Sequence, residues 1–556
     1  MVAVFSGMTL LTGAKPNPRP DPKITSVFPL GGQSGTSWQA VVRGTGLSAA
    51  RAIVLPEAGL RGRVVGVRTE EQAGAKEQSG GKDAPAIHLV DVEFTANAGV
   101  TGKHPFRLVG ESGVTNELTL QITDVPAVDE KSAAPLNRFP VVIQGRIEKP
   151  GESDTIWLEA KTGETLTFSA TSGNSSLDPS LTILEQSGSW FDAGRLNSVA
   201  FNDEPLYFPG LSNDARLVHQ FAKPGRYALQ IRAFSGQGSP DHTYQVRIDS
   251  GTGADPSLHP VREPAWDERM FTRKIVPDWL ARLARRGGEE RSDEVVPVVQ
   301  AGSDAGAAAV AKAPVIVEGR IQKPAETQRI QIQVDQPQDL AIEIETPEAT
   351  MPRFNPVVRL LAPDGSEIVT NVYTKRNNNG LYMMKMIQAK STFSVRAPGS
   401  YVLEIRDITT DVAGNDFRYR VLVRPQIPHL GKIEVTEDRL NLEPGEAKAL
   451  TIGLDREESF SGLASVSVEG LPEGVTVVTG MANPVEKPPL PNGGRLERYV
   501  GRPQIASLMI VASPEAPLTE LPAKIRVVAS AIRDNRVTTR IVVKEMPLMV
   551  IPRRPS

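Results

Sequence analysis

Residues 142–152 read Val-Ile-Gln-Gly-Arg-Ile-Glu-Lys-Pro-Gly-Glu, and residues 315–326 read Val-Ile-Val-Glu-Gly-Arg-Ile-Gln-Lys-Pro-Ala-Glu. Aligning the shared Gly-Arg-Ile of the two segments, Gly145 with Gly319, gives an offset of 319 − 145 = 174 residues. A match of this length between distant segments indicates an internal duplication. If the duplication covers a whole fold unit, the same offset should recur at the far end of each copy.

The same offset relates two corner motifs, Pro-Gly-Arg-Tyr ending at Tyr227 and Pro-Gly-Ser-Tyr ending at Tyr401, since 401 − 227 = 174. Alternating apolar residues follow each Tyr, which is the period of a strand with one buried face. We therefore predict an all-β chain of tandem antiparallel β-sandwiches, immunoglobulin-like or jelly-roll-like. We expect both Tyr rings to be buried at equivalent strand starts and to have no catalytic role.

Residues 138–249 carry six short motifs: Gly145-Arg146-Ile147, Asp154-Thr155-Ile156-Trp157-Leu158, Leu177-Asp178-Pro179-Ser180-Leu181, Phe201-Asn202-Asp203, Asn213-Asp214-Ala215-Arg216-Leu217 and Gly225-Arg226-Tyr227. In these motifs the segment resembles the bacterial pre-peptidase C-terminal (PPC) domain. The second copy keeps the framing strands but has Thr374-Lys375-Arg376-Asn377 where the family has an acidic Asn-Asp turn. The resemblance implies a β-sandwich of the kind that usually accompanies secreted hydrolases.

Two further segments resemble known modules. Residues 24–36, Ile-Thr-Ser-Val-Phe-Pro-Leu-Gly-Gly-Gln-Ser-Gly-Thr, resemble the start of IPT/TIG domains, and the Gly-Leu-Pro-Glu-Gly-Val corner at 470–475 resembles bacterial surface immunoglobulin-like modules. A chain of 556 residues has room for about four domains of the usual size. We predict a leader or signal remnant and linker at 1–22, an IPT/TIG-like sandwich at 23–125, PPC-like sandwiches at 136–250 and 314–425, a linker at 251–313 and an immunoglobulin-like sandwich at 428–552.

The linker is the part that breaks the strand pattern. Residues 278–287, Asp-Trp-Leu-Ala-Arg-Leu-Ala-Arg-Arg-Gly, follow Pro277 and read as a short amphipathic helix with basic residues in its last turn and Gly at its C-cap. Its aromatic residue Trp279 and the nearby Trp266 either dock on a neighbouring sandwich or belong to a segment that binds a partner or a membrane surface.

Composition excludes several classes of function. The formal net charge is −3, so no basic field attracts nucleic acid or anionic lipid. No apolar run approaches the roughly 20 residues of a membrane-spanning helix, and we expect no transmembrane segment. Cysteine is absent, which excludes disulfides and thiolate catalysis. Residues 1–14 resemble the apolar core of a secretory signal without its basic start, so we expect export to the periplasm, the cell surface or the exterior.

No catalytic motif stands out. The six His include no His-Glu-x-x-His pair, and no Gly-x-Ser-x-Gly elbow occurs. We therefore expect no enzyme activity and no cofactor. The strongest polar constellation consists of oxygen-bearing side chains in the turns of the first PPC-like unit: Asp178, Asn202, Asp203, Glu204, Asn213 and Asp214. Oxygen ligands of this kind are what Ca²⁺ selects, whereas the alternative is that Asp and Asn cap turns through bonds to the backbone.

These observations favour a non-catalytic, exported, multidomain binding or scaffold protein of the bacterial cell envelope or exterior. Its ligand is then a protein or a polysaccharide. The alternative is an accessory component that holds substrate for the separate catalytic subunit of a secreted peptidase or other hydrolase system.

Overall fold

The computed structural model describes these residues: 21–70, 85–131, 134–173, 176–186, 196–203, 215–251, 296–302, 309–346, 354–376, 383–387, 390–409, 413–414, 417–458, 460–478, 480–482, 504–533 and 536–553. Throughout these ranges the chain forms strands, turns and loops, and no helix is present. The predicted all-β sandwich class is therefore confirmed. The predicted helix at 278–287 with its Trp279, and the nearby Trp266, lie outside the described residues.

Unit 1 contains two sheets, with strand orders β1-β2-β5-β4 and β3-β6-β7, and β8 also pairs with β6. Its strands are β1 (Lys23–Phe28), β2 (Ser37–Thr45), β3 (Ala50–Val54), β4 (Leu60–Thr69), β5 (Ile87–Ala96), β6 (Gly102–Gly110), β7 (Gly113–Val114) and β8 (Leu118–Ile122). Alternate residues of β5, including Val90, Val92 and Phe94, are buried between the sheets. This is the inward and outward alternation expected of a strand with one covered face.

Unit 2 also contains two sheets, with strand orders β15-β12-β17-β10-β9 and β11-β16-β13-β14. Its strands are β9 (Ala127–Asp129), β10 (Val141–Arg146), β11 (Ser153–Ala160), β12 (Thr165–Ser172), β13 (Pro179–Gln186), β14 (Leu196–Asn202), β15 (Arg216–Gln220), β16 (Gly225–Ala233) and β17 (Thr243–Ser250). Both sheets contribute to one apolar core, for example through Phe168 and Leu229.

Unit 3 has the strand orders β18-β20-β29-β22-β27 and β19-β21-β28-β23-β24, with a separate hairpin β25-β26. Its strands are β18 (Val298–Gln300), β19 (Val310–Ala311), β20 (Val315–Arg320), β21 (Gln328–Val334), β22 (Gln338–Glu345), β23 (Pro356–Leu361), β24 (Glu367–Thr370), β25 (Val372–Arg376), β26 (Met383–Ile387), β27 (Lys390–Val395), β28 (Gly399–Asp407) and β29 (Arg418–Pro425).

Units 2 and 3 share one topology. The larger sheet of unit 2, read as β9-β10-β17-β12-β15, corresponds strand by strand to β18-β20-β29-β22-β27 in unit 3. The second sheets match as well, with β11-β16-β13-β14 corresponding to β21-β28-β23-β24. The edge strands β9 and β18 pair in parallel with β10 and β20, and both precede the segments 136–250 and 314–425 that the sequence marks as repeats. The duplicated unit thus includes an edge strand contributed by the preceding segment.

Unit 4 has the strand orders β30-β32-β36-β34 and β31-β38-β37-β33-β35. Its strands are β30 (His429–Val435), β31 (Leu440–Leu442), β32 (Ala447–Glu457), β33 (Leu463–Glu469), β34 (Val475–Val478), β35 (Gly480–Ala482), β36 (Gln504–Ala512), β37 (Ala523–Arg533) and β38 (Arg536–Val550). Its largest pairing joins β37 to β38, and the short β31 pairs in parallel with the end of β38.

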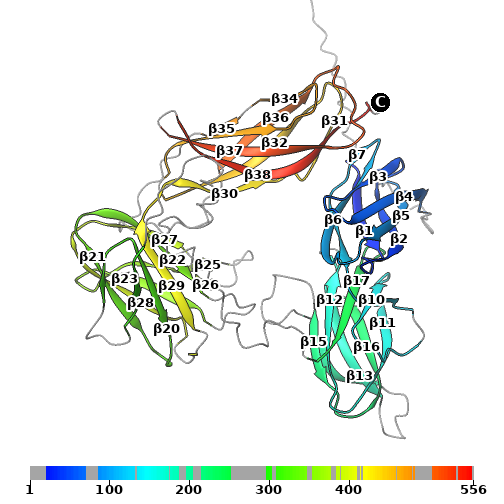
Figure 1. Cartoon of the computed structure of the whole chain (residues 1–556), viewed down its shortest axis with the longest axis horizontal. Coiled ribbons are helices and arrows are strands. Elements are labelled where there is room, and N and C mark those ends of the chain that lie inside the picture. The colour runs from blue at the N-terminus through cyan, green and yellow to red at the C-terminus, as the bar shows by residue number, and fades with distance from the viewer. Residues whose placement is uncertain are drawn as a thin grey trace, which may run out of the picture.

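The contacts between units do not all follow the order of the chain. Figure 1 shows units 1 and 2 on one side, unit 3 on the other and unit 4 across the top. Unit 1 contacts unit 2 through Gln144, whose side chain accepts a hydrogen bond from the Leu30 amide at 2.9 Å and donates one to the Gly31 carbonyl at 3.0 Å. Unit 1 also contacts unit 4, where Val114 and Met549 belong to one buried apolar cluster.

In the described ranges there is no helix long and apolar enough to span a membrane.

Candidate functional site

The repeated Gly-Arg-Ile motif is explained by a tyrosine on the neighbouring strand. Gly145 of β10 lies opposite Tyr244 of β17, and Gly319 of β20 lies opposite Tyr419 of β29. A Cβ atom at Gly145 would come within 2.3 Å of the Tyr244 ring, and one at Gly319 within 2.2 Å of the Tyr419 hydroxyl. Because nothing larger than glycine fits beneath the ring, this position fixes where the tyrosine hydroxyl points in both units.

In unit 2 that hydroxyl meets two carboxyl groups. The Tyr244 hydroxyl lies 2.6 Å from Asp154 Oδ2 and 3.1 Å from Glu130 Oε2. The Arg146 amide donates a hydrogen bond to Glu130 Oε2 at 2.7 Å. Glu130 is the residue directly after the edge strand β9, and its side chain therefore fills the space over Gly145 from the edge of the sheet.

The carboxyl groups of Glu130 and Asp154 cannot both be ionised at low cost. Burial, together with the nearby charge of Asp154, raises the pKa of Glu130 to about 7, and burial also raises the pKa of Asp154. Burial raises the pKa of Tyr244 as well, so its hydroxyl keeps its proton. A phenol has one proton to donate, so a protonated Glu130 lets all three groups be satisfied together. The cluster is a closed, internally paired site.

In unit 3 the corresponding space is open. The position of Asp154 is taken by Gln328, whose Oε1 accepts a hydrogen bond from the Tyr419 hydroxyl at 2.5 Å. The position of Glu130 is taken by Ala301. The Glu130 amide donates a hydrogen bond to the Gln144 carbonyl of β10, and the Ala301 amide donates one to the Glu318 carbonyl at the equivalent position of β20. A methyl group therefore stands where unit 2 has a carboxylate.

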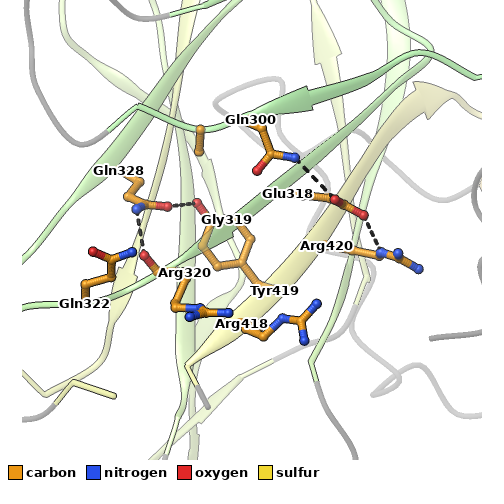
Figure 2. A pocket seen from close by; sticks show the side chains of 10 residues that line it. Gln300, Glu318, Gly319, Arg320, Gln322, Gln328, Arg418, Tyr419 and Arg420 are labelled. Carbon is orange, nitrogen blue, oxygen red and sulfur yellow. Dashed lines mark hydrogen bonds and ion pairs between the residues drawn. The ribbon is translucent and has the colours of Figure 1, made fainter. Parts of the chain in front are cut away.

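The result is a cavity of about 320 Å³ at the edge of the β18-β20-β29 sheet. Figure 2 shows its lining, which is polar apart from Ala301 and Gly319 and includes three arginines; the lining residues are Gln300, Ala301, Glu318, Gly319, Arg320, Gln322, Gln328, Arg418, Tyr419 and Arg420. The lining thus includes one carboxylate and three guanidinium groups.

The charged groups of the cavity have fixed places. Arg420 Nε donates to Glu318 Oε1 at 2.6 Å, and Gln300 Nε2 donates to Glu318 Oε2 at 3.3 Å. Arg320 and Arg418 lie directly opposite each other on β20 and β29, so both guanidinium groups reach the same part of the cavity (Figure 2). The Gln328 amide donates to the Arg320 carbonyl at 2.7 Å and holds that end of β20.

A second polar cluster lies where unit 3 meets unit 4. Arg424 and Glu458 are fully buried, and both guanidinium NH₂ groups of Arg424 donate to Glu458 at 2.7 Å. Glu343 also accepts from Arg424, and Lys390 donates to Glu458 at 3.0 Å. Burial alone would raise the pKa of Glu458, but the hydrogen bonds and charge of Arg424, with the charge of Lys390, outweigh it and lower that pKa to about 2. This cluster joins two units and leaves no room for a ligand between the paired groups.

The structure describes three of the predicted calcium ligands of unit 2, namely Asp178, Asn202 and Asp203, and Asn202 of β14 lies opposite Leu181 of β13. The Asp178 carbonyl accepts a hydrogen bond from the Phe234 amide, and the Asn202 side chain donates to the Arg216 carbonyl on the other sheet. Asn202 Oδ1 also accepts from the Asp203 amide at 3.0 Å. These bonds match the turn-capping alternative for Asn202. Glu204, Asn213 and Asp214 lie outside the described residues.

For the residues that the structure describes, no three His, Asp or Glu side chains gather closely enough to hold a metal ion.

The two corner tyrosines lie as predicted. Tyr227 is 4% exposed and Tyr401 is 5% exposed, each near the start of its strand, β16 or β28. Their hydroxyls donate to the carbonyls of Lys223 at 2.9 Å and of Ala397 at 2.8 Å, four residues earlier in each case. Each tyrosine thus closes its own corner, and this is a structural role.

The sequence reasoning did not find the cavity residues. It used Gly-Arg-Ile only as a marker of the repeat. A signal was present at the other end, where Thr243-Tyr244-Gln245 of the first copy corresponds to Arg418-Tyr419-Arg420 of the second. Two new arginines flanking a tyrosine that is kept in both copies mark a position where the two units differ in charge.

No protein-family model matches the chain, and no curated protein sequence matches it. Among solved structures it is similar to the secreted serine protease VesC from Vibrio cholerae, with 11% identity over 40% of this chain and 48% of that one and a TM-score of 0.15. It is also similar to tripeptidyl peptidase 2, with 9% identity over 96% of this chain and 41% of that one and a TM-score of 0.14. It is similar to the S-layer protein SbsC as well, with 10% identity over 96% of this chain and 54% of that one and a TM-score of 0.14. The chain thus spans about half the length of the solved structures it matches.

Proposed function

We propose that the protein is an exported, non-catalytic binding or scaffold protein of the bacterial cell envelope or exterior, with a protein or polysaccharide as its ligand. The observation that carries this proposal is that specific side-chain contacts join the units to one another. Asp241 of unit 2 accepts hydrogen bonds at 2.7 Å from Thr25, Ser26 and Arg43 of unit 1. Together with Arg424–Glu458, such contacts hold four sandwiches in fixed positions, as a scaffold requires.

The contacts of two buried histidines, His104 and His429, support a non-catalytic role. His104 lies 2.6 Å from Glu57, and His429 lies 2.6 Å from the Ile427 carbonyl. Neither contact is the bond between a base and a hydroxyl nucleophile that acyl-transfer sites use. These histidines support turns and the junction between units 3 and 4. The polar clusters of the described residues likewise bond within a sandwich or across a junction, apart from the cavity of unit 3.

The proposal is tested by two assays on the purified full chain. In the first, incubation with protein and polysaccharide substrates should give no turnover; turnover that is lost on replacing a single His would contradict the non-catalytic role. In the second, the chain is immobilised and exposed to cell-envelope extract, beside the variant Asn441→Ala. Asn441 of unit 4 makes two hydrogen bonds to the Val114 backbone of unit 1, and the variant removes both. A scaffold should retain a defined partner, and the variant should retain less of it. Equal retention by both would show that the arrangement of units does not matter for binding.

A further inference from the structure

We propose that strand β9 and Glu130 form a pH-operated latch on unit 2, which is closed on the edge of β10 at acidic pH and opens as the pH rises past neutral. This inference goes beyond the proposed scaffold function and holds whatever the protein binds. It stands on the attachment of β9, on the buried cluster that receives Glu130, and on the equivalent edge strand of unit 3, where Ala301 replaces the acid.

The attachment of β9 by its own residues is slight. The strand is three residues long and pairs in parallel with β10. The Val142 amide donates to the Pro126 carbonyl at 2.9 Å, and the Glu130 amide donates to the Gln144 carbonyl at 3.0 Å. Val128 packs against the core of unit 2 but is partly exposed, and the side chains on either side of it are exposed. The Glu130 side chain therefore supplies a large share of the contacts that hold this strand.

The Glu130 carboxyl group is received by groups from three strands. The Arg146 amide of β10 donates to its Oε2 at 2.7 Å, and the Tyr244 hydroxyl of β17 lies 3.1 Å from the same oxygen. That hydroxyl also lies 2.6 Å from Asp154 of β11. The Arg146 guanidinium lies over the ring of Phe28 in unit 1, on the other face of the sheet. One hydroxyl thus stands between two acids.

The surrounding charges leave the two acids to share a proton. Burial, and then the charge of Asp154, raises the pKa of Glu130 to about 7. Glu152 places a further negative charge near Asp154, and the exposed Lys131 places a positive one there. Burial lowers the pKa of His242, which directly precedes β17, so this histidine is neutral from pH 7 upward. The pair of acids therefore gives up its last proton near neutral pH.

Loss of that proton opens the latch because leaving the cluster separates the two charges. An ionised Glu130 that stays in place faces an ionised Asp154 with one phenol proton between them. In the open state Glu130 is in water and has its ordinary pKa of 4.5. The two pKa values predict that opening is about tenfold more favourable at pH 8 than at pH 6. Opening frees the Val142 and Arg146 amides and the Gln144 carbonyl at the edge of β10.

The edge strand β18 of unit 3 has the same attachment without the acid. The Ile316 amide donates to the Pro297 carbonyl at 2.9 Å, and the Ala301 amide donates to the Glu318 carbonyl at 2.8 Å. Ala301 has no proton to lose, and Gln328 stands in the place of Asp154. We therefore expect β18 to stay in place over the same pH range, so the chain contains its own control.

The test is hydrogen–deuterium exchange of the full chain at pH 6 and at pH 8. Each exchange rate is divided by the rate of the same sequence in an unstructured peptide at that pH. The protection of the Glu130 amide should fall about tenfold between pH 6 and pH 8, whereas that of the Ala301 amide should stay the same. Equal changes at both amides, or no change at Glu130, would overturn the proposal.

Two variants separate ionisation from packing. Glu130→Gln resembles the protonated acid and cannot ionise, so protection of β9 should be equal at both pH values. Asp154→Asn removes the repelling charge, so an ionised Glu130 stays between its two donors and the change should fall below about threefold. Protection of β16, in the core of unit 2, shows that each variant is folded. A change of about tenfold that persists in Glu130→Gln would mean that another group operates the strand, and would overturn the proposal.

Discussion

Asn441 of unit 4 completes the backbone hydrogen bonding of Val114 in unit 1. Its Oδ1 accepts from the Val114 amide at 2.8 Å and its Nδ2 donates to the Val114 carbonyl at 3.0 Å. Asn441 is fully buried, and a Cβ atom at Gly113 would come within 2.2 Å of Asn441 Oδ1. The Asn441 side chain thus pairs with the Val114 backbone as a neighbouring strand would. It joins the first and last units, although Val114 and Asn441 are 327 residues apart in the chain.

Replacing Asn441 with Ala should separate units 1 and 4. The change leaves two buried backbone groups of Val114 without partners, at about 1 to 3 kcal/mol for each group. Small-angle X-ray scattering should show a larger radius of gyration, and the Val114 amide should exchange faster with deuterium. Asn371 bonds the Val358 amide and the Pro356 carbonyl in the same way inside unit 3. As a control, Asn371→Ala should destabilise unit 3 and leave the radius unchanged; an equal radius in both variants would contradict the role of Asn441.

Truncation of the corner tyrosines should be costly. Tyr227→Ala or Tyr401→Ala should lower the free energy of unfolding by about 3 to 5 kcal/mol, as expected for a packed aromatic ring. Tyr→Phe at either position should cost only about 1 kcal/mol, because it removes just the hydrogen bond to the carbonyl four residues earlier. Denaturant melts measure both. A loss below about 1 kcal/mol for the Ala variants would mean that the rings contribute little to the cores.

The stability of unit 2 should fall as the pH rises. Glu130 has a pKa of about 7 in the folded chain and 4.5 as its ordinary value, so the unfolded chain loses this proton first. Its contribution is therefore fully present below about pH 4.5 and is lost as the pH rises through about 7. Denaturant melts of wild type and Glu130→Gln at pH 5 and pH 8 should show a larger fall in the wild type. Equal falls would show that Glu130 does not hold its proton.

The buried ion pair between units 3 and 4 should respond strongly to the loss of one partner. Arg424→Met leaves Glu458 buried without its main counter-charge and should cost about 3 to 5 kcal/mol. The double variant Arg424→Met with Glu458→Gln should cost less than the sum of the single changes, which a double-mutant cycle in denaturant melts would measure. Additive losses would argue that the two groups do not interact.

The pair of Arg424 and Glu458 also limits the stability of the protein at low pH. The pKa of Glu458 is lowered to about 2 from an ordinary value of 4.5. Its contribution to stability is therefore present above about pH 4.5 and is lost as the pH falls toward 2. Acid unfolding of unit 4 should begin at higher pH in Arg424→Met than in the wild type. Incubation across a pH series, followed by tryptic digestion at neutral pH, would measure this.

The duplication and the sandwich class were predictable because both leave a local trace. Strand alternation places Ile156 and Leu158 in the core, and the Pro-Gly-x-Tyr corner places the two Tyr rings there, from sequence alone. The cavity was not predictable in this way. It depends on a strand pairing between Arg320 and Arg418, which lie about a hundred residues apart, and on Ala301, which sits before the repeat that the sequence marks. Neither the pairing nor the edge strand β18 has a periodic signal.

The junction residues were hidden for a related reason. Asn441 and Glu458 look like ordinary turn and surface residues in the sequence, since their partners belong to other units. Glu458 also has a φ of +51°, a left-handed conformation that is uncommon for a non-glycine residue and that no local pattern indicates. Only the packing of whole units against one another gives these residues their roles.

The contact between Asn441 and Val114 also means that covalent and spatial neighbours differ in this molecule. The chain passes from unit 2 to unit 3 through residues 252–295, while contacts between described residues lead from unit 2 through units 1 and 4 to unit 3. A single proteolytic cut between residues 251 and 296 would therefore yield two fragments, each of two units, still joined at the first and last sandwich. Lys448 lies 3.6 Å from Asp21, so the start of the described chain is also near unit 4. The two halves of the chain could then be joined in the reverse order, as a circular permutation, without changing which units touch.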